Sequence, residues 1–329
     1  MGSSMSHWER FRAALRGDAV DRVPISLWRH WPLEDGSAEG LARATLGWQE
    51  EHDFDLVKVT PAGTYGVEDW GAGTEYKPNR HGVRTVPRPG LTSFEEWPHL
   101  KPLEAKQGYL GRQLTALRQV VEGVGDRAPV LMTVFSPLTT AMKLAGSRVF
   151  ADLRLQPEVF ARGLSVIAET TARFSVACLQ TGAHGIFFAT QCATYRLLSE
   201  VEYRAFGEPY DRVVLEAARS HAEILLLHVH GEDIMFDLVA SYPVDGMNWH
   251  DRTAGPSLRE AGARFPGMLV GGINEWGALS EAAPAEIEGE IRQAIDQTAG
   301  LRFMVGPGCV VPIDTPAENL RAARKAVEG

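Results

Sequence analysis

Eight short apolar segments alternate with segments of helical periodicity, and this alternation constrains the fold more than any other feature. Near-continuous apolar runs are typical of parallel strands that are buried on both faces. Eight such strands, each followed by a helix, predict an α/β fold of the (β/α)8 TIM-barrel type. The predicted strands span residues 23–28, 56–60, 129–135, 185–189, 224–228, 244–249, 268–272 and 301–305.

A doubly wound open sheet is the main alternative, because it also alternates strands with helices. No glycine-rich phosphate-binding fingerprint follows the first predicted strand, which favours the barrel. The chain has no obvious linker, so we expect a single domain over residues 5–329, with Met1–Ser4 as a vector-derived remnant. From the second strand to about Pro102 the chain is rich in Gly, Pro and Trp, which predicts a long excursion, for example a hairpin lid.

Charge and composition exclude several classes of protein. The 42 acidic and 33 basic residues give a net charge of −9, which argues against a nucleic-acid-binding surface. The chain shows no signal-peptide pattern and no apolar run long enough to span a membrane, so we expect a cytoplasmic protein. The three cysteines, Cys178, Cys192 and Cys309, have no disulfide-like spacing, in keeping with a reducing compartment.

Two histidines stand at the end of the fifth predicted strand. His228 and His230 are two residues apart, so they share one face of a strand, about 6–7 Å from each other at Cα. The eighth strand leads to Cys309, and a barrel brings all strand ends around one mouth. Two imidazoles and one thiolate are good zinc ligands that leave a fourth position open. The alternative is that the histidines are hydrogen-bonded strand-end residues and Cys309 is buried filler.

Other polar residues also follow predicted strands. His250, beside Asp251 and Arg252, is a candidate acid or base, with a loop salt-bridge cluster as the alternative. Arg29 is a candidate for binding a substrate carboxylate, or else forms a structural ion pair. Glu275 is a candidate base or fourth metal ligand. Candidate substrate-binding residues at the same strand ends are Tyr65, Gln191, Asn248, Trp249 and Asn274.

Two acids follow the histidine pair directly. Glu232 and Asp233 are candidate hydrogen-bond partners of a ligand histidine, an arrangement that orients the imidazole. The alternative is that they cap the helix predicted to start at Ile234, since acids are favoured in the first helical turn.

Several segments of the chain, from about Arg10 to the C-terminus, resemble the uroporphyrinogen decarboxylase superfamily. The segments that carry the resemblance are Arg22–Ile25 with Arg29 beyond it, Phe135–Thr139, Tyr203–Tyr210, Gly271–Asn274 and Gly306–Asn319. The resemblance implies a (β/α)8 barrel, which agrees with the strand count. It also implies one of two chemistries, decarboxylation of a tetrapyrrole or zinc-dependent methyl transfer.

The chain departs from the decarboxylase pattern at three catalytic places. The early arginine-rich segment keeps only Arg29, and the stretch Val59–Ala62 lacks the aspartate that faces the pyrrole nitrogens in those enzymes. The late Gly-His-Gly is replaced by Gly306–Cys309. These departures argue against tetrapyrrole decarboxylation.

The other branch of the superfamily contains zinc-dependent corrinoid methyltransferases, which bind zinc through His-x-Cys and a late cysteine. This chain is similar to that pattern, with His230 in place of the first cysteine. The resemblance therefore implies a zinc site at His228, His230 and Cys309. One fewer thiolate makes the zinc more electropositive, so a non-thiol substrate, or hydrolytic or lyase chemistry, stays open.

We therefore expect a zinc-dependent methyltransferase that acts on a small-molecule or corrinoid-bound methyl group. His250, Glu275 and Arg29 would orient the substrate or move protons. The chain has no Asp-x-His-x-x-Gly segment, so a corrinoid would come from a partner protein or as a free cofactor. The alternatives are a cofactor-free decarboxylase, with Arg29 holding a carboxylate and His250 protonating the carbanion, and a non-catalytic corrinoid or tetrapyrrole binder.

Overall fold

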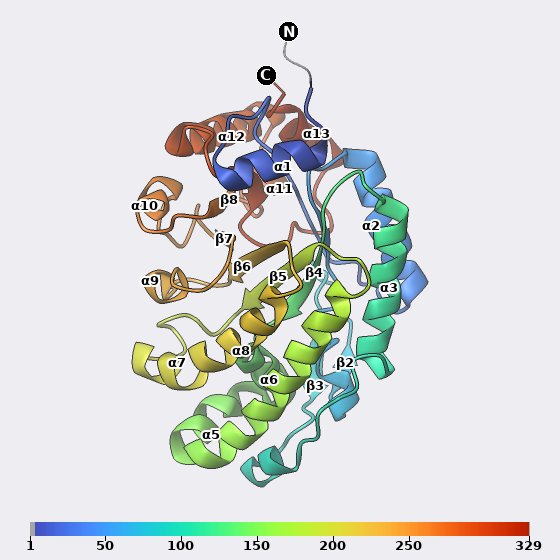
Figure 1. Cartoon of the computed structure of the whole chain (residues 1–329), viewed down its shortest axis with the longest axis vertical. Helices are drawn as coiled ribbons and strands as arrows, with labels where there is room; N and C mark the ends of the chain where they lie inside the picture. The colour runs from blue at the N-terminus through green and yellow to red at the C-terminus, as the bar shows by residue number, and fades with distance from the viewer. Residues whose placement is uncertain (1–3, 329) are drawn as a thin grey trace.

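Seven parallel strands form one curved sheet in the order β1-β4-β5-β6-β7-β8-β9 (Figure 1). The computed structural model describes residues 4–328, so the predicted remnant Met1–Ser4 lies, apart from Ser4, outside the described residues. The strands are β1 (Val57–Val59), β4 (Val130–Phe135), β5 (Gly185–Thr190), β6 (Ile224–Val229), β7 (Gly246–Trp249), β8 (Met268–Ile273) and β9 (Phe303–Pro307). Seven of the eight predicted strands therefore form as regular strands.

The first predicted strand, residues 23–28, is reduced to a single parallel bridge between Ile25 and Val305. Val305 N donates to Pro24 O, and Asp55 N donates to Ile25 O. The segment thus lies between β9 and the chain entering β1, which is the position of the first strand in a barrel. The curled sheet is TIM-barrel-like, and the doubly wound alternative is wrong.

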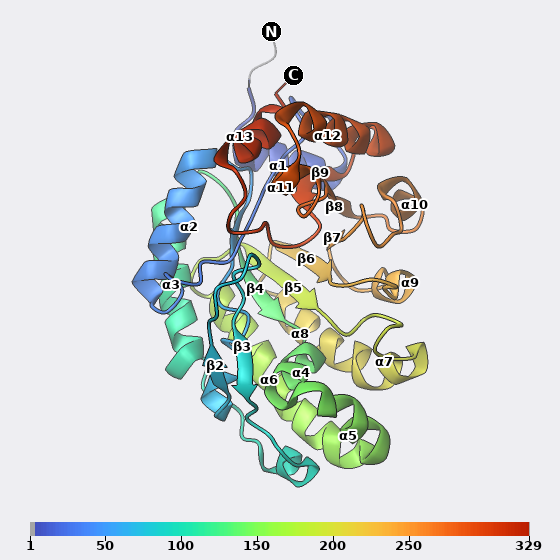
Figure 2. The ribbon, with the colours of Figure 1, turned by 180° about the vertical axis from the view of Figure 1, so that it is seen from behind.

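Helices surround the outer face of the sheet, and the two chain ends lie at the same end of the molecule (Figures 1 and 2). The helices are α1 (His7–Arg16), α2 (Ala38–His52), α3 (Gly108–Val124), α4 (Pro137–Ala145), α5 (Val149–Leu155), α6 (Pro157–Leu179), α7 (Glu200–Phe206), α8 (Glu208–Arg219), α9 (Phe236–Val239), α10 (Leu258–Gly262), α11 (Ala278–Glu281), α12 (Pro284–Thr298) and α13 (Ala317–Lys325), with 3-10 turns η1 (Glu68–Trp70), η2 (Phe94–His99) and η3 (Gly146–Arg148). Across residues 4–328, no helix combines the length and apolarity needed to cross a membrane.

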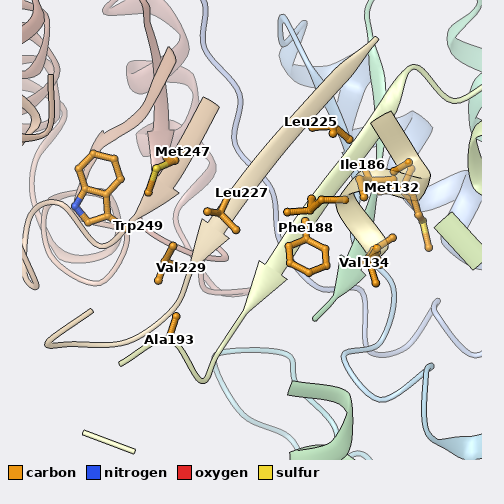
Figure 3. Close-up of a cluster of buried hydrophobic side chains, with 14 of the residues drawn as sticks. Met132, Val134, Ile186, Phe188, Ala193, Leu225, Leu227, Val229, Met247 and Trp249 are labelled. Atoms are coloured by element: carbon orange, nitrogen blue, oxygen red, sulfur yellow. The ribbon is translucent and has the colours of Figure 1, made fainter. Parts of the chain in front are cut away.

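Alternate residues of each strand face the helices or the interior of the curved sheet, as strand geometry requires. Figure 3 shows part of the buried cluster to which Phe188, Leu225 and Leu227 belong, beneath the helices. A second buried cluster contains Phe187 and Leu226. It lines the interior, together with Trp28, Leu56, Leu131, Met268, Val270 and Met304. His228 is two residues beyond Leu226, so it also points into the interior.

The chain between β1 and α3 forms η1, an antiparallel hairpin and η2. The hairpin pairs β2 (Gly73–Glu75) with β3 (Thr85–Arg88). Its connection reaches the loops after β8 and β9, because Ile313 N donates to Arg80 O and the Arg80 side chain pairs with Asp314 and Glu281. The hairpin therefore lies beside the ends of the strands that carry the polar residues described next.

Candidate metal centre

The C-terminal ends of four neighbouring strands carry the polar cluster. His228 is the last residue but one of β6, and His230 follows that strand directly. His250 follows β7, Glu275 follows β8, and Cys309 follows β9. The four strands are parallel and adjacent, so their ends lie at the same edge. The ligand atoms of His228, His230 and Cys309 all lie within 4.8 Å of one another, as the predicted metal set requires.

Asn248 determines how His228 presents its ring. The Asn248 Nδ2 group donates to Val270 O and Pro307 O, both at 2.9 Å, which leaves Oδ1 as the acceptor. His228 Nδ1 lies 2.7 Å from that Oδ1 and therefore carries the proton. Burial lowers the pKa of His228, which favours the neutral ring. Its Nε2 lone pair is thus available to a metal, and a partner of this kind is typical of metal-bound histidines.

The thiol of Cys309 faces three imidazoles. Its Sγ lies 3.6 Å from His230 Nδ1. Burial acts to raise the pKa of Cys309, but the neighbouring imidazoles of His228, His230 and His250 hold it well below the usual range. The cluster therefore favours the thiolate, which is the form that binds metals.

Glu275 connects His250 to the turn that carries Cys309. Glu275 is 2% exposed, and its Oε2 accepts a hydrogen bond from Gly308 N at 2.9 Å. Its Oε1 lies 3.3 Å from His250 Nδ1, and His250 Nε2 lies 3.3 Å from His230 Nδ1. Burial lowers the pKa of His250, but Cys309 and Glu275 together raise it to about 10. Glu275 thus orients both His250 and the Cys309 turn.

The three consecutive residues His250, Asp251 and Arg252 do not form one cluster in the structure. Asp251 Oδ1 accepts from Gly272 N at 3.0 Å, and Arg252 Nε lies 3.7 Å from Asp251. Asp251 and Arg252 therefore form the structural ion cluster, whereas His250 takes Glu275 as its partner.

The donor set fits a zinc ion. It combines an available imidazole nitrogen on His228, a second imidazole on His230 and a thiolate on Cys309, in one compact group. Nitrogen and sulfur ligands of this kind are preferred by Zn²⁺. Three protein ligands leave one coordination position for a substrate.

Four predicted site residues, the first two of which are Arg29 and Tyr65, contact other parts of the protein instead. The Arg29 guanidinium lies 4.3 Å from the centre of the Trp31 ring and donates to Ile313 O, with no ion pair within residues 4–328. The structural ion pair predicted for Arg29 is therefore wrong for residues 4–328, whereas carboxylate binding stays a prediction, since the buried Nε of Arg29 has no hydrogen-bond partner. The Tyr65 hydroxyl donates to a strand carbonyl, that of Thr133.

Trp249 faces the helices, because it alternates with Asn248 along β7. Its indole donates to Pro256 O, and its ring packs against Phe236. Asn274 Oδ1 accepts from the backbone N–H groups of Trp276 and Gly277, which orders the loop after β8. Neither side chain joins the cluster.

The remaining predicted residues also contact other groups of the protein. Asn248 orients His228, so its position supports a positioning role and not the predicted contact with substrate. Gln191 is partly exposed, and its backbone N–H donates to Thr139. Glu232 and Asp233 pair with Arg196 at the surface, and α9 begins only at Phe236, so they neither hold a ligand histidine nor cap that helix.

Two polar residues lie near the cluster, and one of them, Lys58, was not predicted from the sequence. Lys58 lies in β1 and is 8% exposed, and His30 is 7% exposed. A lysine inside an apolar strand that is expected to be buried on both faces is an unusual residue, and that signal could have identified Lys58.

Fold and cluster together define a TIM-barrel-like protein with a candidate metal centre at the C-terminal ends of its strands. The family model for uroporphyrinogen decarboxylase (URO-D) matches residues 6–329, and the chain belongs to this family.

The chain is similar to family members that are named for two different activities. It is 22% identical over 334 residues to the methylcobamide:CoM methyltransferase MtbA of Methanosarcina acetivorans, with 95% of each chain covered. It is 24% identical to the uroporphyrinogen decarboxylase of Anaeromyxobacter dehalogenans, with 98% of each chain covered. A solved structure, a methyltransferase from Methanosarcina mazei, matches with a TM-score of 0.86 at 21% identity over 98% of both chains. This structural likeness establishes the shared fold.

Proposed function

We propose that this protein is a methyltransferase that moves a methyl group between a corrinoid and a small molecule, with one zinc ion held by His228, His230 and Cys309. The observation that carries the proposal is the convergence of the three ligand atoms within 4.8 Å. Similarity to relatives named as methyltransferases supports it. The corrinoid would come from a partner protein or as a free cofactor, and the enzyme would act in the cytoplasm. The site would lie at the C-terminal ends of the strands of a complete (β/α)8 barrel, with residues 23–28 as its first strand.

The residues of the chain divide the work at this site. A zinc ion bound there would supply a Lewis acid with an open position, which lowers the pKa of a bound thiol or hydroxyl group. Asn248 keeps the His228 Nδ1 proton in place, so that Nε2 faces the ligand cluster. His250 holds a proton at Nδ1 against Glu275 and directs Nε2 toward His230 and the site. Its raised pKa keeps His250 positively charged at neutral pH, so it is placed to stabilise the negative charge that an acceptor group carries after losing its proton.

The decarboxylase alternative has less support from the structure than the methyltransferase proposal. That alternative used Arg29 to hold a substrate carboxylate, but the Arg29 side chain stacks on Trp31 and bonds to Ile313 O. The methyltransferase proposal uses residues that do converge, and it is therefore favoured.

Elemental analysis of the purified protein tests the metal. We expect about one zinc per chain in the wild type. The variants Cys309→Ala and His230→Ala should lose it. Cys178→Ala is the matched control, because Cys178 is a buried cysteine of α6 outside the cluster and its replacement should leave the zinc in place.

Turnover separates the three functional hypotheses. With methylcobalamin and a small thiol, we expect the zinc-loaded wild type to form the methyl thioether, detected by mass spectrometry, and Cys309→Ala to form none. A wild type without metal would contradict the proposal. Release of CO₂ from a carboxylated tetrapyrrole would support the decarboxylase, and tetrapyrrole binding without turnover would support the binder.

A further inference from the structure

His230 lies just beyond the regular part of β6. The next residue, Gly231, has a φ of 100°, so the chain turns away from the sheet at this point. The backbone N–H of His230 donates to Thr190 O at 2.9 Å, one step beyond the last paired residues of β5 and β6, Thr190 and Val229 (Figure 3). Strand ends open more readily than strand centres, so the position of His230 depends on what holds Thr190.

The segment that follows β5 supports the turn that contains His230. Met235 N donates to Ala193 O at 2.9 Å, and Thr194 pairs with Ile234 as an isolated bridge. The turn after β6 is therefore attached to the continuation of β5 on both sides of its bend. A shift at the end of β5 would be passed on to His230.

A chain of buried hydroxyl groups anchors Thr190. Its Oγ1 lies 3.1 Å from the Tyr203 hydroxyl, which donates to Asp211 Oδ2 at 2.6 Å. Since the one O–H of Tyr203 is directed to Asp211, Thr190 is the donor in the first contact. Thr190, Tyr203 and Asp211 are all fully buried. The hydrogen bonds therefore run in one direction, from the end of β5 through α7 to α8, and they hold the Thr190 side chain in one orientation.

Asp211 is an unusual residue for this place in the fold. Within residues 4–328 its carboxyl group accepts hydrogen bonds from Tyr203 and Tyr242, both at Oδ2, and its buried Oδ1 has no partner. The neighbouring cation, Arg212, pairs instead with Glu208 at 2.9 Å. Burying a carboxyl group with neutral partners is unfavourable, and an apolar side chain of similar shape would pack there at less cost. The presence of a carboxyl group thus indicates a role for its hydrogen bonds.

We propose that Tyr203 and Asp211 are positioning residues of the metal centre, which hold His230 in place through Thr190. Tyr203 supplies the hydroxyl that restrains Thr190, and Asp211 supplies the acceptor that restrains Tyr203. The restraint acts on the backbone of His230 and so fixes the point from which its imidazole extends. This inference rests on the proposed function in one respect, because His230 must be a metal ligand for its position to affect zinc affinity.

Deuterium exchange of the His230 amide, followed by NMR on the protein as purified, measures the restraint directly. Tyr203→Phe should speed this exchange by about 10-fold or more, since the strand end opens more often once Thr190 has lost its partner. Tyr242→Phe is the matched control. The Tyr242 hydroxyl donates to the same oxygen of Asp211 at 2.9 Å but makes no hydrogen bond to Thr190 within residues 4–328. It should leave the exchange at His230 unchanged relative to amides in the middle of β6.

Zinc affinity shows whether the restraint serves the metal centre. In competition with a chelator, Tyr203→Phe should bind zinc about 10-fold more weakly than Tyr242→Phe, as expected when a group that orients a ligand is lost. Asp211→Asn should match the wild type, because the amide oxygen still accepts from Tyr203, whereas Asp211→Leu should match Tyr203→Phe. A role in stability alone would not separate the two tyrosine variants, since each loses one hydrogen bond to the same carboxyl group.

Thr190 variants decide the question if Tyr203→Phe does not fold. Thr190→Ser retains the hydroxyl and should exchange at His230 like the wild type. Thr190→Val removes the hydroxyl with little change in shape and should speed the exchange as Tyr203→Phe does. The double variant should exchange no faster at His230 than either single variant, because both changes break the same hydrogen bond to Thr190.

Failure of this inference can be told apart from failure of the metal site. A wild type without zinc would overturn the proposed function, and the exchange rates would still decide whether Tyr203 and Asp211 hold His230. The inference is overturned if Tyr203→Phe and Tyr242→Phe have the same exchange rate at His230. It is also overturned if the two variants, loaded with zinc, have the same zinc affinity.

Discussion

The two ends of the barrel-like sheet both carry buried charged and imidazole groups, but they use them differently. At the N-terminal end, Asp55 is fully buried and accepts hydrogen bonds from Arg10 Nη1 at 2.7 Å, His7 Nδ1 at 2.8 Å and Ile25 N at 2.9 Å. Arg22 adds a further ion pair at 2.6 Å. Burial would raise the pKa of Asp55, but His7 and Arg22 lower it to about 2. Every oxygen of this carboxylate has a partner within the chain.

At the C-terminal end, the partners are incomplete. The Nε2 of His228 points at the cluster, and within residues 4–328 Lys58 has no carboxylate partner and His30 Nδ1 has no hydrogen-bond partner. This contrast teaches that burial alone does not mark a functional site. The N-terminal network satisfies itself and so stabilises the fold, whereas the mouth offers donor atoms and charge to a ligand, as expected for the C-terminal end of such a barrel.

The largest effect on stability should come from the N-terminal end. Asp55→Asn should lower the free energy of unfolding by roughly 3–5 kcal/mol, because it leaves Arg10 and Arg22 with an incomplete partner in a buried site. Urea denaturation measures this change. Zinc content per folded chain should stay the same, and loss of zinc in the folded variant would show that the two ends are coupled.

His250 tests whether the mouth carries chemistry beyond metal binding. His250→Gln should lower kcat for methyl transfer by about 100-fold, because the cation placed to stabilise the deprotonated acceptor group is lost. Stability should change little, as His250 is partly exposed. Steady-state kinetics on the zinc-loaded variant measures the effect. An unchanged kcat with full zinc content would remove His250 from the proposed function.

The sequence alone predicts the candidate metal ligands at the C-terminal end of the sheet, but not their hydrogen-bond partners. Two-residue periodicity placed His228 and His230 on one face of their strand, and the predicted barrel brought the end of the eighth strand, with Cys309, to the same mouth. The partners of these ligands depend on side chains brought together from different strands, so Asn248 and Glu275 could be listed as polar strand-end residues but not given their positioning roles. The sequence also did not show that the Arg29 guanidinium stacks on the neighbouring Trp31 indole.

Asn248 is a buried polar residue at the C-terminal end of the sheet, and it orients the candidate ligand His228. Asn248→Ala should weaken zinc affinity by about 10- to 100-fold, the usual effect of removing a partner of a ligand histidine. Asn319→Ala is the matched control, because that buried amide also donates to two carbonyls, those of Leu279 and Ala282. Competition with a chelator measures the affinity. Equal zinc affinities in the two variants would contradict the role of Asn248.

Asp211 is an intermediate case between the two ends of the sheet. It is a fully buried carboxyl whose partners are neutral, the hydroxyls of Tyr203 at 2.6 Å and Tyr242 at 2.9 Å. Burial raises its pKa to about 7, with the two hydroxyls opposing that rise. The folded state therefore retains a proton that the unfolded chain releases, so stability should fall as the pH rises from about 4 to 7.

Asp211→Asn should remove that fall, because the amide cannot ionise. We expect the variant to gain roughly 4 kcal/mol relative to the wild type between pH 4 and pH 8, since each unit of pKa difference is worth about 1.4 kcal/mol. Thermal melts across this pH range check it. A difference between the two proteins that does not grow with pH would mean that Asp211 is already ionised in the folded state.

X-ray absorption at the zinc K-edge of the purified protein is the most direct test of the metal centre. The account predicts a first shell with two imidazole nitrogens at about 2.0–2.1 Å and one sulfur at about 2.3 Å. That sulfur should disappear from the zinc shell of Cys309→Ala, if that variant retains any zinc at all. A first shell without sulfur in the wild type, or one that keeps its sulfur after Cys309 is replaced, would contradict the assignment of His228, His230 and Cys309 as the ligands.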